Sequence, residues 1–286
     1  MQPVSRRVRG DGGLDLHLLE WSAQGVPLLL LHGYGNEAHV WDDFAPAVSP
    51  HYRTLALDHR GHGDSAWDAQ GRYDHDTLVR DVEAVTAALG IQRLVLVAHS
   101  LGGRIATLFA GRHPARMAGL VLVDIGPELD ARGTTRIRLE IETNREPSFG
   151  SVDEYARLLS LHYPAAQPHA LLRMAQHGVR RLENGRFVPK LDPALRGAGR
   201  GGAARTSSEE DLTRAQWEAL ASIPCPTLVV RGAASDVLSA DVAERMALEV
   251  LPKGSLAVVA RAGHSVMTDN PDGFRDAVTA FMLGEG

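Results

Sequence analysis

Short, continuous apolar runs separated by helical patterns are the feature that most constrains how this chain folds. Four runs lie in the first half of the chain and two near its end: 28–31, 54–57, 94–98, 120–123, 227–230 and 256–260. Strands that are apolar at every position suit a parallel sheet covered by helices on both faces. Helical stripes lie between or after the runs, as in residues 78–89, 242–250 and 274–282. The alternation predicts a doubly wound, mostly parallel α/β sheet with right-handed crossovers.

The alternation stops in the middle of the chain. Between residues 127 and 222 we expect no buried strand, although several polar helical stretches occur, and residues 184–206 are rich in Gly, Pro and Arg and indicate a loop. We therefore expect a core of residues 1–126 and 223–286. Residues 127–222 are expected to form a helical cap, or lid, inserted between strands 6 and 7 of the core sheet.

Composition sets limits on partners and compartment. The net charge of -5 is too small to argue for a nucleic acid or an anionic membrane as partner. We expect neither a segment that crosses a bilayer, which needs about 20 apolar residues, nor a secretory signal. Cys225 is the single cysteine, so neither an intrachain disulfide nor a cysteine metal cluster is expected. We expect a cytoplasmic monomer or homodimer whose partner is a small-molecule substrate, with no nucleic-acid or membrane partner.

The strongest motif is residues 98–103, which read AHSLGG and directly follow the apolar run 94–98. A nucleophile elbow needs this strand–turn–helix context, because a sharp turn holds a strained Ser with its hydroxyl exposed. Small residues two positions before and after the Ser let the strand and the helix approach closely. The alternative is an ordinary helix start, where Ser is a common cap. The context favours Ser100 as a nucleophile.

A second motif is the turn LHGYG at residues 31–35, at the end of another apolar run. An oxyanion hole needs two backbone N–H groups aimed at the developing negative charge. A glycine-flanked turn beyond a strand lets one N–H point into a pocket. The backbone N–H groups of Tyr34 and Leu101 are the candidate donors.

A third motif is RAGH at residues 261–264, between the last expected strand and the final expected helix. Thirteen histidines are present, so most have no catalytic meaning. His264 differs from the others because it occupies the place of the base in the chain order Ser, Asp, His. We therefore interpret His264 as the candidate general base.

Together the three motifs resemble the α/β-hydrolase superfamily, and the resemblance extends over nearly the whole chain. It includes residues 58–65 (DHRGHGDS), which are similar to the superfamily's loop after the fourth strand, and residues 224–227 (PCPT) before the seventh. The resemblance implies an eight-stranded sheet and a catalytic Ser–His pair, but it specifies the substrate poorly. It also implies structural roles for Asp64 and Ser65 and a buried position for Cys225.

The resemblance leaves two positions for the catalytic acid. In the commonest arrangement the acid follows the seventh strand, where this chain has Ser235, with Asp236 one residue late. In a second arrangement, similar to that of haloalkane dehalogenases, the acid follows the sixth strand, where Asp124 stands. A side chain that caps a turn is the alternative for Asp124. Asp124 is favoured and Asp236 is the alternative acid. Asp124, the helical insertion and the RGxxS pattern at 231–235 most resemble the branch containing 2-(acetamidomethylene)succinate hydrolase.

The resemblance implies acyl transfer, with a Ser nucleophile, a His base and an acid that orients the imidazole. The expected function is cleavage of a carboxylic ester, lactone or amide of a small soluble substrate, without cofactor or metal. C–C bond hydrolysis or cofactor-free perhydrolysis on the same scaffold is the alternative. A non-catalytic ligand receptor is disfavoured, since Ser100 and His264 are both present.

Side chains near the motifs are candidates for the substrate pocket: His32, Trp41, His99, Arg104 and Ile125, with parts of residues 134–141 and 155–163 from the lid. Ordinary core packing is the alternative for most of them. The lid also carries six arginines: Arg132, Arg136, Arg138, Arg145, Arg157 and Arg173. Binding of an anionic substrate and solvated helix faces explain these arginines equally well.

Overall fold

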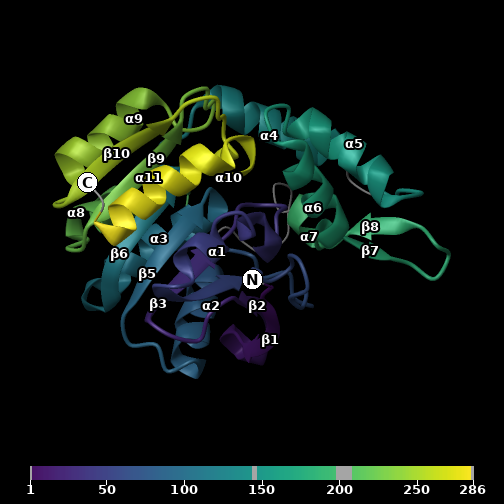
Figure 1. Ribbon diagram of the computed structural model, residues 1–286, viewed down its shortest axis with the longest axis horizontal. Helices are drawn as coiled ribbons and strands as arrows, with labels where there is room; N and C mark the ends of the chain where they lie inside the picture. Colours follow the sequence, from purple (N-terminus) through teal and green to yellow (C-terminus); the bar gives the residue numbers. More distant parts are fainter. Residues whose placement is uncertain (1, 144–146, 198–207, 285–286) are drawn as a thin grey trace.

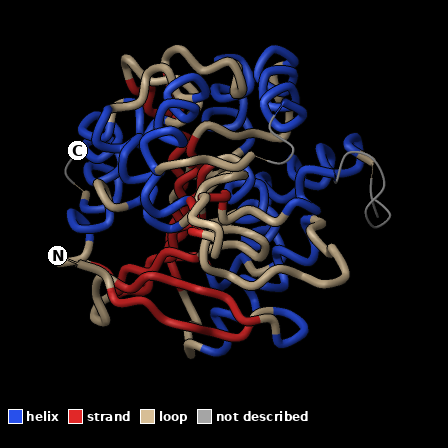
Figure 2. The backbone as a smooth tube through the Cα atoms, turned by 90° about the vertical axis from the view of Figure 1, so that its right-hand side faces the viewer, coloured by secondary structure: helices blue, strands red, loops and turns tan. Residues whose placement is uncertain are grey.

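The computed structural model describes residues 2–143, 147–197 and 208–284. Its centre is an eight-stranded sheet with the order β1-β2-β4-β3-β5-β6-β9-β10, seen in Figures 1 and 2. The strands are β1 (Val4–Arg9), β2 (Asp15–Glu20), β3 (Val26–Leu31), β4 (Tyr52–Leu57), β5 (Leu94–His99), β6 (Met117–Val123), β9 (Thr227–Gly232) and β10 (Gly254–Val259). The β1–β2 and β2–β4 pairs are antiparallel, and the other pairs in this sheet are parallel. The predicted doubly wound α/β fold is confirmed.

Helices cover both faces of the sheet, which explains why the central strands are apolar throughout. Leu29 and Leu31 of β3 belong to one buried cluster, whereas Leu28 and Leu30 belong to the other. The first cluster includes residues from α2 (His75–Ala88), α3 (Leu101–Arg112), α8 (Glu209–Ser222), α9 (Ala240–Glu244) and the π-helical turn η4 (Arg245–Val250). The second includes residues from η2 (Ala38–Trp41), α1 (Ala45–Val48), α10 (Val266–Asp269) and α11 (Pro271–Leu283). Two short 3-10 turns also occur: η1 (Asp11–Gly13) and η3 (Pro114–Arg116). None of the helices in the described part of the chain is long and apolar enough to cross a membrane.

The carboxyl ends of the parallel strands meet along one edge of the sheet. Six segments follow these ends directly: residues 32–36 after β3, 58–65 after β4, 100 after β5, 124 after β6, 233–236 after β9 and 260–265 after β10. Parallel pairing brings these segments together although they are far apart in the sequence. All three sequence motifs therefore lie at the same edge.

In the eight-stranded sheet, the two strands that no apolar run predicted are β1 and β2. In β1 the charged side chains of Arg6, Arg7 and Arg9 are exposed, and Val8 is its only buried residue. β1 is the outermost strand on one side of the sheet, and charged side chains are typical of such a strand. An edge strand of this kind has no apolar run to recognise, so only the family resemblance implied it.

Residues 127–207, between β6 and α8, are called the inserted segment here. The described part contains α4 (Ala131–Thr143), α5 (Val152–His162), α6 (Pro168–Gly178), β7 (Val179–Arg181), β8 (Phe187–Pro189) and α7 (Pro193–Gly197). Helices α5 and α6 pack together around Leu159, Met174 and Ala175. Figure 1 shows these elements as an arch beside the sheet, joined to the core at α4.

Two expectations about this region need correction. Helix α8, expected within the cap, packs on α3, and its Leu212 and Leu220 belong to a core cluster. The core therefore resumes at about residue 208 instead of 223, because the apolar side of α8 faces the core. The expected loop 184–206 contains β8 and α7, which are too short for sequence patterns to reveal; residues 198–206 lie outside the described part.

Candidate active site

Ser100 stands at a sharp turn between β5 and α3. Its backbone angles, φ 51° and ψ −118°, are rare for a residue with a side chain and are worth about 1–3 kcal/mol of strain. The Ser100 N–H donates to the Val123 carbonyl (3.2 Å), and the Gly102 N–H donates to the His32 carbonyl (3.2 Å). A Cβ at Gly102 would lie 2.5 Å from the Leu31 carbonyl oxygen. The glycine therefore allows α3 to start directly against β3, which holds the turn in place.

A continuous line of hydrogen bonds joins Ser100 to a buried carboxylate. His264 Nε2 lies 3.0 Å from Ser100 Oγ, and His264 Nδ1 lies 2.9 Å from Asp124 Oδ2. Asp124 is fully buried. Its Oδ1 accepts from the Gly232 N–H (3.0 Å), and its Oδ2 also accepts from the Ser235 hydroxyl (2.5 Å). Because the carboxylate accepts at Nδ1, the imidazole Nε2 is left to accept the serine proton.

The alternative acid, Asp236, is engaged elsewhere. Arg136 of α4 donates to both of its carboxylate oxygens, at 2.7 and 2.9 Å. These hydrogen bonds lower the pKa of Asp236. The carboxylate that contacts His264 is Asp124, and Asp236 connects the inserted segment to the loop after β9.

The turn after β3 lies against the elbow, as the two expected oxyanion donors require. A Cβ at Gly33 would fall 2.7 Å from His99 Nδ1 and 3.1 Å from Ser100 Cβ, so only glycine fits there without displacement. The Asn36 N–H closes the turn on the Gly33 carbonyl (3.2 Å), with Tyr34 inside the turn. Leu101 is the first residue of α3, where backbone N–H groups have no intrahelical acceptor. Tyr34 and Leu101 therefore flank Ser100 from two elements.

His99 and His32, the two histidines expected in the pocket, form hydrogen bonds that hold backbone groups in place. His99 lines the cavity, and its Nε2–H donates to the His264 carbonyl (2.9 Å). Burial lowers the pKa of His99 well below its ordinary value, so this imidazole is neutral. His32 lies beneath the turn: its Nε2 accepts from the His59 N–H (3.1 Å), and its Nδ1–H donates to the Gly33 carbonyl (2.8 Å). His32 supports the turn but is not among the residues that line the cavity.

Three other expected pocket residues do not line the cavity. Trp41 is fully buried among core aromatic rings. Arg104 pairs with Glu209 of α8 (2.9 Å). The side chain of Ile125 lies where a Cβ at Gly103 would be. Each is close to a motif in sequence, but its side chain faces the core or another helix.

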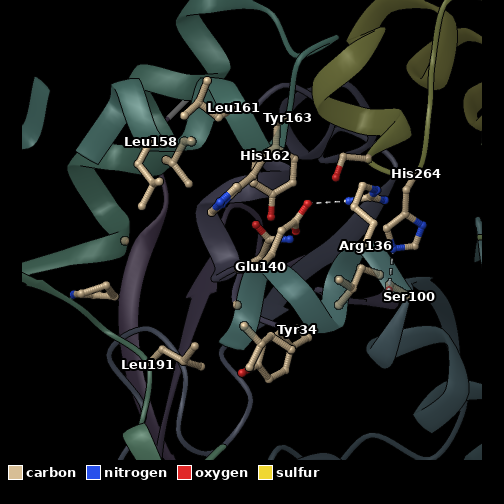
Figure 3. A pocket seen from close by; sticks show the side chains of 18 of the residues that line it. Tyr34, Ser100, Arg136, Glu140, Leu158, Leu161, His162, Tyr163, Leu191 and His264 are labelled. Atoms are coloured by element: carbon tan, nitrogen blue, oxygen red, sulfur yellow. Dashed lines mark hydrogen bonds and ion pairs between the residues drawn. The ribbon is translucent and has the colours of Figure 1, made fainter. Parts of the chain in front are cut away.

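A cavity of about 520 Å³ opens beside Ser100 and His264 (Figure 3). One side is formed by core residues such as Tyr34, His99 and Asp236. The opposite wall comes from α4, α5 and the residue after α5: Arg136, Ile137, Glu140, Ile141, Tyr155, Leu158, Leu159, Leu161, His162 and Tyr163. Parts of residues 134–141 and 155–163 thus form the wall, as expected. Of the six arginines noted in the lid, only Arg136 lines the cavity among those described; Arg145 lies outside the described residues.

Sequence reasoning missed the contribution of Ser235. Its hydroxyl donates to the Asp124 carboxylate and accepts from the N–H groups of Val237 (3.1 Å) and Leu238 (3.1 Å). The signal was present, because Ser235 occupies the common position for the acid. Only the three-dimensional arrangement shows that the two positions converge on one point.

Donor groups suited to a metal occur in two places in the described part of the chain: His39, Asp42 and His177, and His17, Asp58 and Asp64. Neither group contains a side chain that contacts Ser100. The His39 ring already contacts Asp42 (3.0 Å) and stacks on His177. Asp58 contacts the His17 ring and accepts from the Ala38 and Asp64 N–H groups. These donors are engaged within the protein.

Comparison with known proteins extends the sequence resemblance. A family model described as alpha/beta hydrolase fold matches residues 26–271. Esterase Rv0045c of Mycobacterium tuberculosis is 31% identical over 265 residues, which cover 88% of this chain and 81% of that protein. The 2-(acetamidomethylene)succinate hydrolase of Mesorhizobium japonicum is 25% identical over 279 residues, which cover 98% and 95%.

Solved structures give the same picture. The crystal structure of E-2-(acetamidomethylene)succinate hydrolase has a TM-score of 0.82 at 25% identity and covers 98% of this chain and 99% of that one. An alpha/beta hydrolase from Novosphingobium aromaticivorans has a TM-score of 0.82 at 29% identity and covers 99% and 98%. Both matches include the core and the inserted segment together.

Proposed function

Because this chain belongs to the α/β-hydrolase family, we propose that it is a serine hydrolase that cleaves a carboxylic ester, lactone or amide through an acyl-enzyme on Ser100. The resemblance to the branch containing 2-(acetamidomethylene)succinate hydrolase is confirmed. The chain is an enzyme of this family, homologous to an esterase. The proposed reaction rests on one observation, the continuous hydrogen-bond line from Asp124 through His264 to Ser100.

In the proposed mechanism His264 Nε2 takes the hydroxyl proton as Ser100 Oγ forms a bond to the substrate carbonyl carbon. Asp124 keeps the proton on Nδ1 and stabilises the imidazolium that forms. Nε2–H then returns the proton to the leaving alcohol or amine as its bond to carbon breaks. Water attacks the acyl-enzyme with the same base, which releases the carboxylic acid and restores Ser100.

The negative charge on the tetrahedral carbonyl oxygen needs fixed donors. We assign these to the N–H groups of Tyr34 and Leu101, which flank Ser100 from the turn and from the start of α3. Rigid N–H groups stabilise the oxyanion more than mobile water does, because they need no reorganisation during the reaction. The close approach at Gly33 supports this assignment.

We assign the role of lid to the inserted segment. Contacts tie it to the core beside the cavity: Gly133 N–H donates to the Asp236 carbonyl (2.9 Å), and Gln167 N–H donates to the Thr268 carbonyl (3.0 Å). Arg173 of α6 also pairs with Asp43, donating to one oxygen at 2.6 Å. A wall held at several points limits the entry of water and shapes the substrate site.

The test is steady-state hydrolysis of p-nitrophenyl butyrate. Ser100→Ala should lose about 10⁴-fold or more in kcat with an unchanged thermal midpoint, because the nucleophile is removed while the elbow stays. Ser160→Ala is the matched control: this serine is exposed on α5 and should behave as wild type. Activity of Ser100→Ala within tenfold of wild type would refute the proposal.

A further inference from the structure

The cavity beside Ser100 has two chemically different ends, which restrict the substrate. Resting on the serine-hydrolase function proposed above, we infer that the site takes uncharged esters with an apolar acyl chain and rejects esters whose acyl chain carries a carboxylate. Two independent features support this: the pairing of the charged groups that line the cavity, and the apolar wall beyond them.

The cations that line the cavity are already paired. Arg136 donates to Asp236 at 2.7 and 2.9 Å and to Glu140 at 2.9 Å. Lys190 contacts Asp64 at 2.8 Å. Arg136 and Lys190 are the arginine and the lysine among the described residues that line the cavity, and both already pair with carboxylates of the protein. Neither is therefore available to pair with a carboxylate on a substrate.

The Arg136 cluster also has the wrong sign for an anion. One guanidinium faces two carboxylates, Asp236 and Glu140, so the cluster carries a net negative charge. A substrate carboxylate placed beside it loses water without gaining a partner, and burying an unpaired charge is costly. Figure 3 shows Arg136 on the side of His264, with Glu140 between Arg136 and the side of Leu158.

The far end of the cavity is apolar. Figure 3 shows Leu158, Leu161 and Leu191 on the side away from Ser100 and His264. Leu161 is 76% exposed, which places it at the mouth of the cavity. Each methylene that passes from water to this wall should raise kcat/KM about fourfold until the cavity is filled, as expected for burial of apolar surface. About 520 Å³ is within the usual range for small-molecule sites.

The experiment compares two esters with the same leaving group. We expect kcat/KM for p-nitrophenyl hexanoate to exceed that for mono(p-nitrophenyl) glutarate by about 100-fold or more, and kcat/KM to rise from acetate to hexanoate. Equal or faster hydrolysis of the glutarate would overturn the inference. So would a flat series from acetate to hexanoate.

A charge variant tests the cause of the selectivity. Glu140→Gln removes one negative charge from the Arg136 cluster and keeps an acceptor for the guanidinium, so the hexanoate-to-glutarate ratio should fall about tenfold. Glu142→Gln is the matched control, since this glutamate lies on the same helix but is exposed and outside the cavity lining. An equal fall in both variants, or no fall in Glu140→Gln, would contradict the assignment to the cluster.

A second variant tests the apolar wall. Leu158→Ala should flatten the rise from acetate to hexanoate, whereas Leu172→Ala, an exposed leucine of α6 outside the cavity, should leave it unchanged. The chemistry is tested separately by a fluorophosphonate probe. A protein that is labelled at Ser100 but prefers the glutarate fails this inference alone, and one that is not labelled at Ser100 fails the proposed function.

Discussion

The sheet edge and the inserted segment form opposite sides of the same cavity, but they are held in different ways. Ser100, Asp124 and His264 follow the carboxyl ends of three strands, and backbone hydrogen bonds and close backbone approaches fix their positions. The wall consists of side chains of α4 and α5, on an insertion that meets the core at separate points, such as the Gly133 N–H to the Asp236 carbonyl and the ion pair of Arg136 with Asp236. Groups fixed at strand ends suit chemistry that needs defined geometry, whereas side chains that only line the cavity can change with little effect on the fold. Substitutions at the edge should therefore cost far more activity than those on the wall.

The largest difference in kcat is expected between substitutions of Asp124 and Asp236. Asp124→Asn should lower kcat by about 10⁴-fold, because an amide no longer fixes the imidazole tautomer. Asp236→Asn, which removes the core partner of Arg136 and leaves the contact of Asp124 with His264 intact, should stay within about tenfold of wild type on a neutral ester. The measurement is kcat for p-nitrophenyl butyrate with both purified variants. A large loss in Asp236→Asn with near-normal Asp124→Asn would reverse the assignment.

The turn at Gly33 tests how rigid the edge must be. Gly33→Ala adds a Cβ only 2.7 Å from His99 Nδ1, so the turn that carries Tyr34 must move. We expect a loss of about 10²-fold in kcat, the size seen when an oxyanion donor is displaced. Gly119→Ala in β6 is the control, since its nearest neighbour would be an ordinary 3.6 Å from the new Cβ. Wild-type kcat in Gly33→Ala would argue against the oxyanion role of this turn.

Buried histidines should make the stability of the core depend on pH. Burial lowers the pKa of His62 to about 4. In the unfolded chain this imidazole takes a proton below its ordinary value of 6.5, while the folded form stays neutral, so stability falls as the pH drops from 6.5 towards 4. His62 alone should contribute a loss of about 2 kcal/mol between pH 7 and pH 5. Chemical denaturation at both pH values should show a smaller loss in His62→Gln. His169→Gln, at an exposed position of α6, should match wild type; equal losses in all three proteins would contradict the account.

The smallest loss of kcat is expected for substitution of Ser235, which contacts the proposed acid Asp124 and not the substrate. Ser235→Ala removes the hydroxyl that donates to Asp124 Oδ2 at 2.5 Å. We expect about a tenfold loss in kcat with little change in KM, since the carboxylate is less well oriented but the cavity is intact. Ser222→Ala, on the exposed side of α8, should keep both constants. A rise in KM without a change in kcat would assign Ser235 to substrate binding instead.

The contrast between the strand ends and the inserted segment also explains which features of the fold and the site could be predicted from the sequence. The central strands and the positions of Ser100 and His264 follow from local patterns, because a strand end fixes where the next residue lies. Which aspartate contacts His264 depends on the convergence of two strand ends, which local patterns do not describe. Asp124 directly follows an apolar run, as the acid in the second family arrangement should.

The direction in which a side chain points does not follow from its distance to a motif in the sequence. His32 and Arg104 are adjacent to motifs, yet His32 supports the turn from below and Arg104 reaches α8. Helix α8 lies at the end of the stretch 127–222, in which the sequence shows no buried strand, yet its apolar side packs on α3 of the core. For the wall, the sequence predicts which segments of α4 and α5 lie near the pocket but not which of their residues line it. Helical periodicity identifies the apolar face of a helix, but it does not identify the element against which that face packs.

The most direct test of the account is the site of covalent labelling by a fluorophosphonate, located by peptide mass spectrometry. We expect one adduct on Ser100 and none in Ser100→Ala. Labelling of His264→Ala should be slowed by at least about 10²-fold, since the base activates the serine. Variants of the α5 wall such as Leu158→Ala should be labelled at nearly the wild-type rate. An adduct on another residue, or unchanged labelling in His264→Ala, would contradict the claim that the sheet edge carries the chemistry.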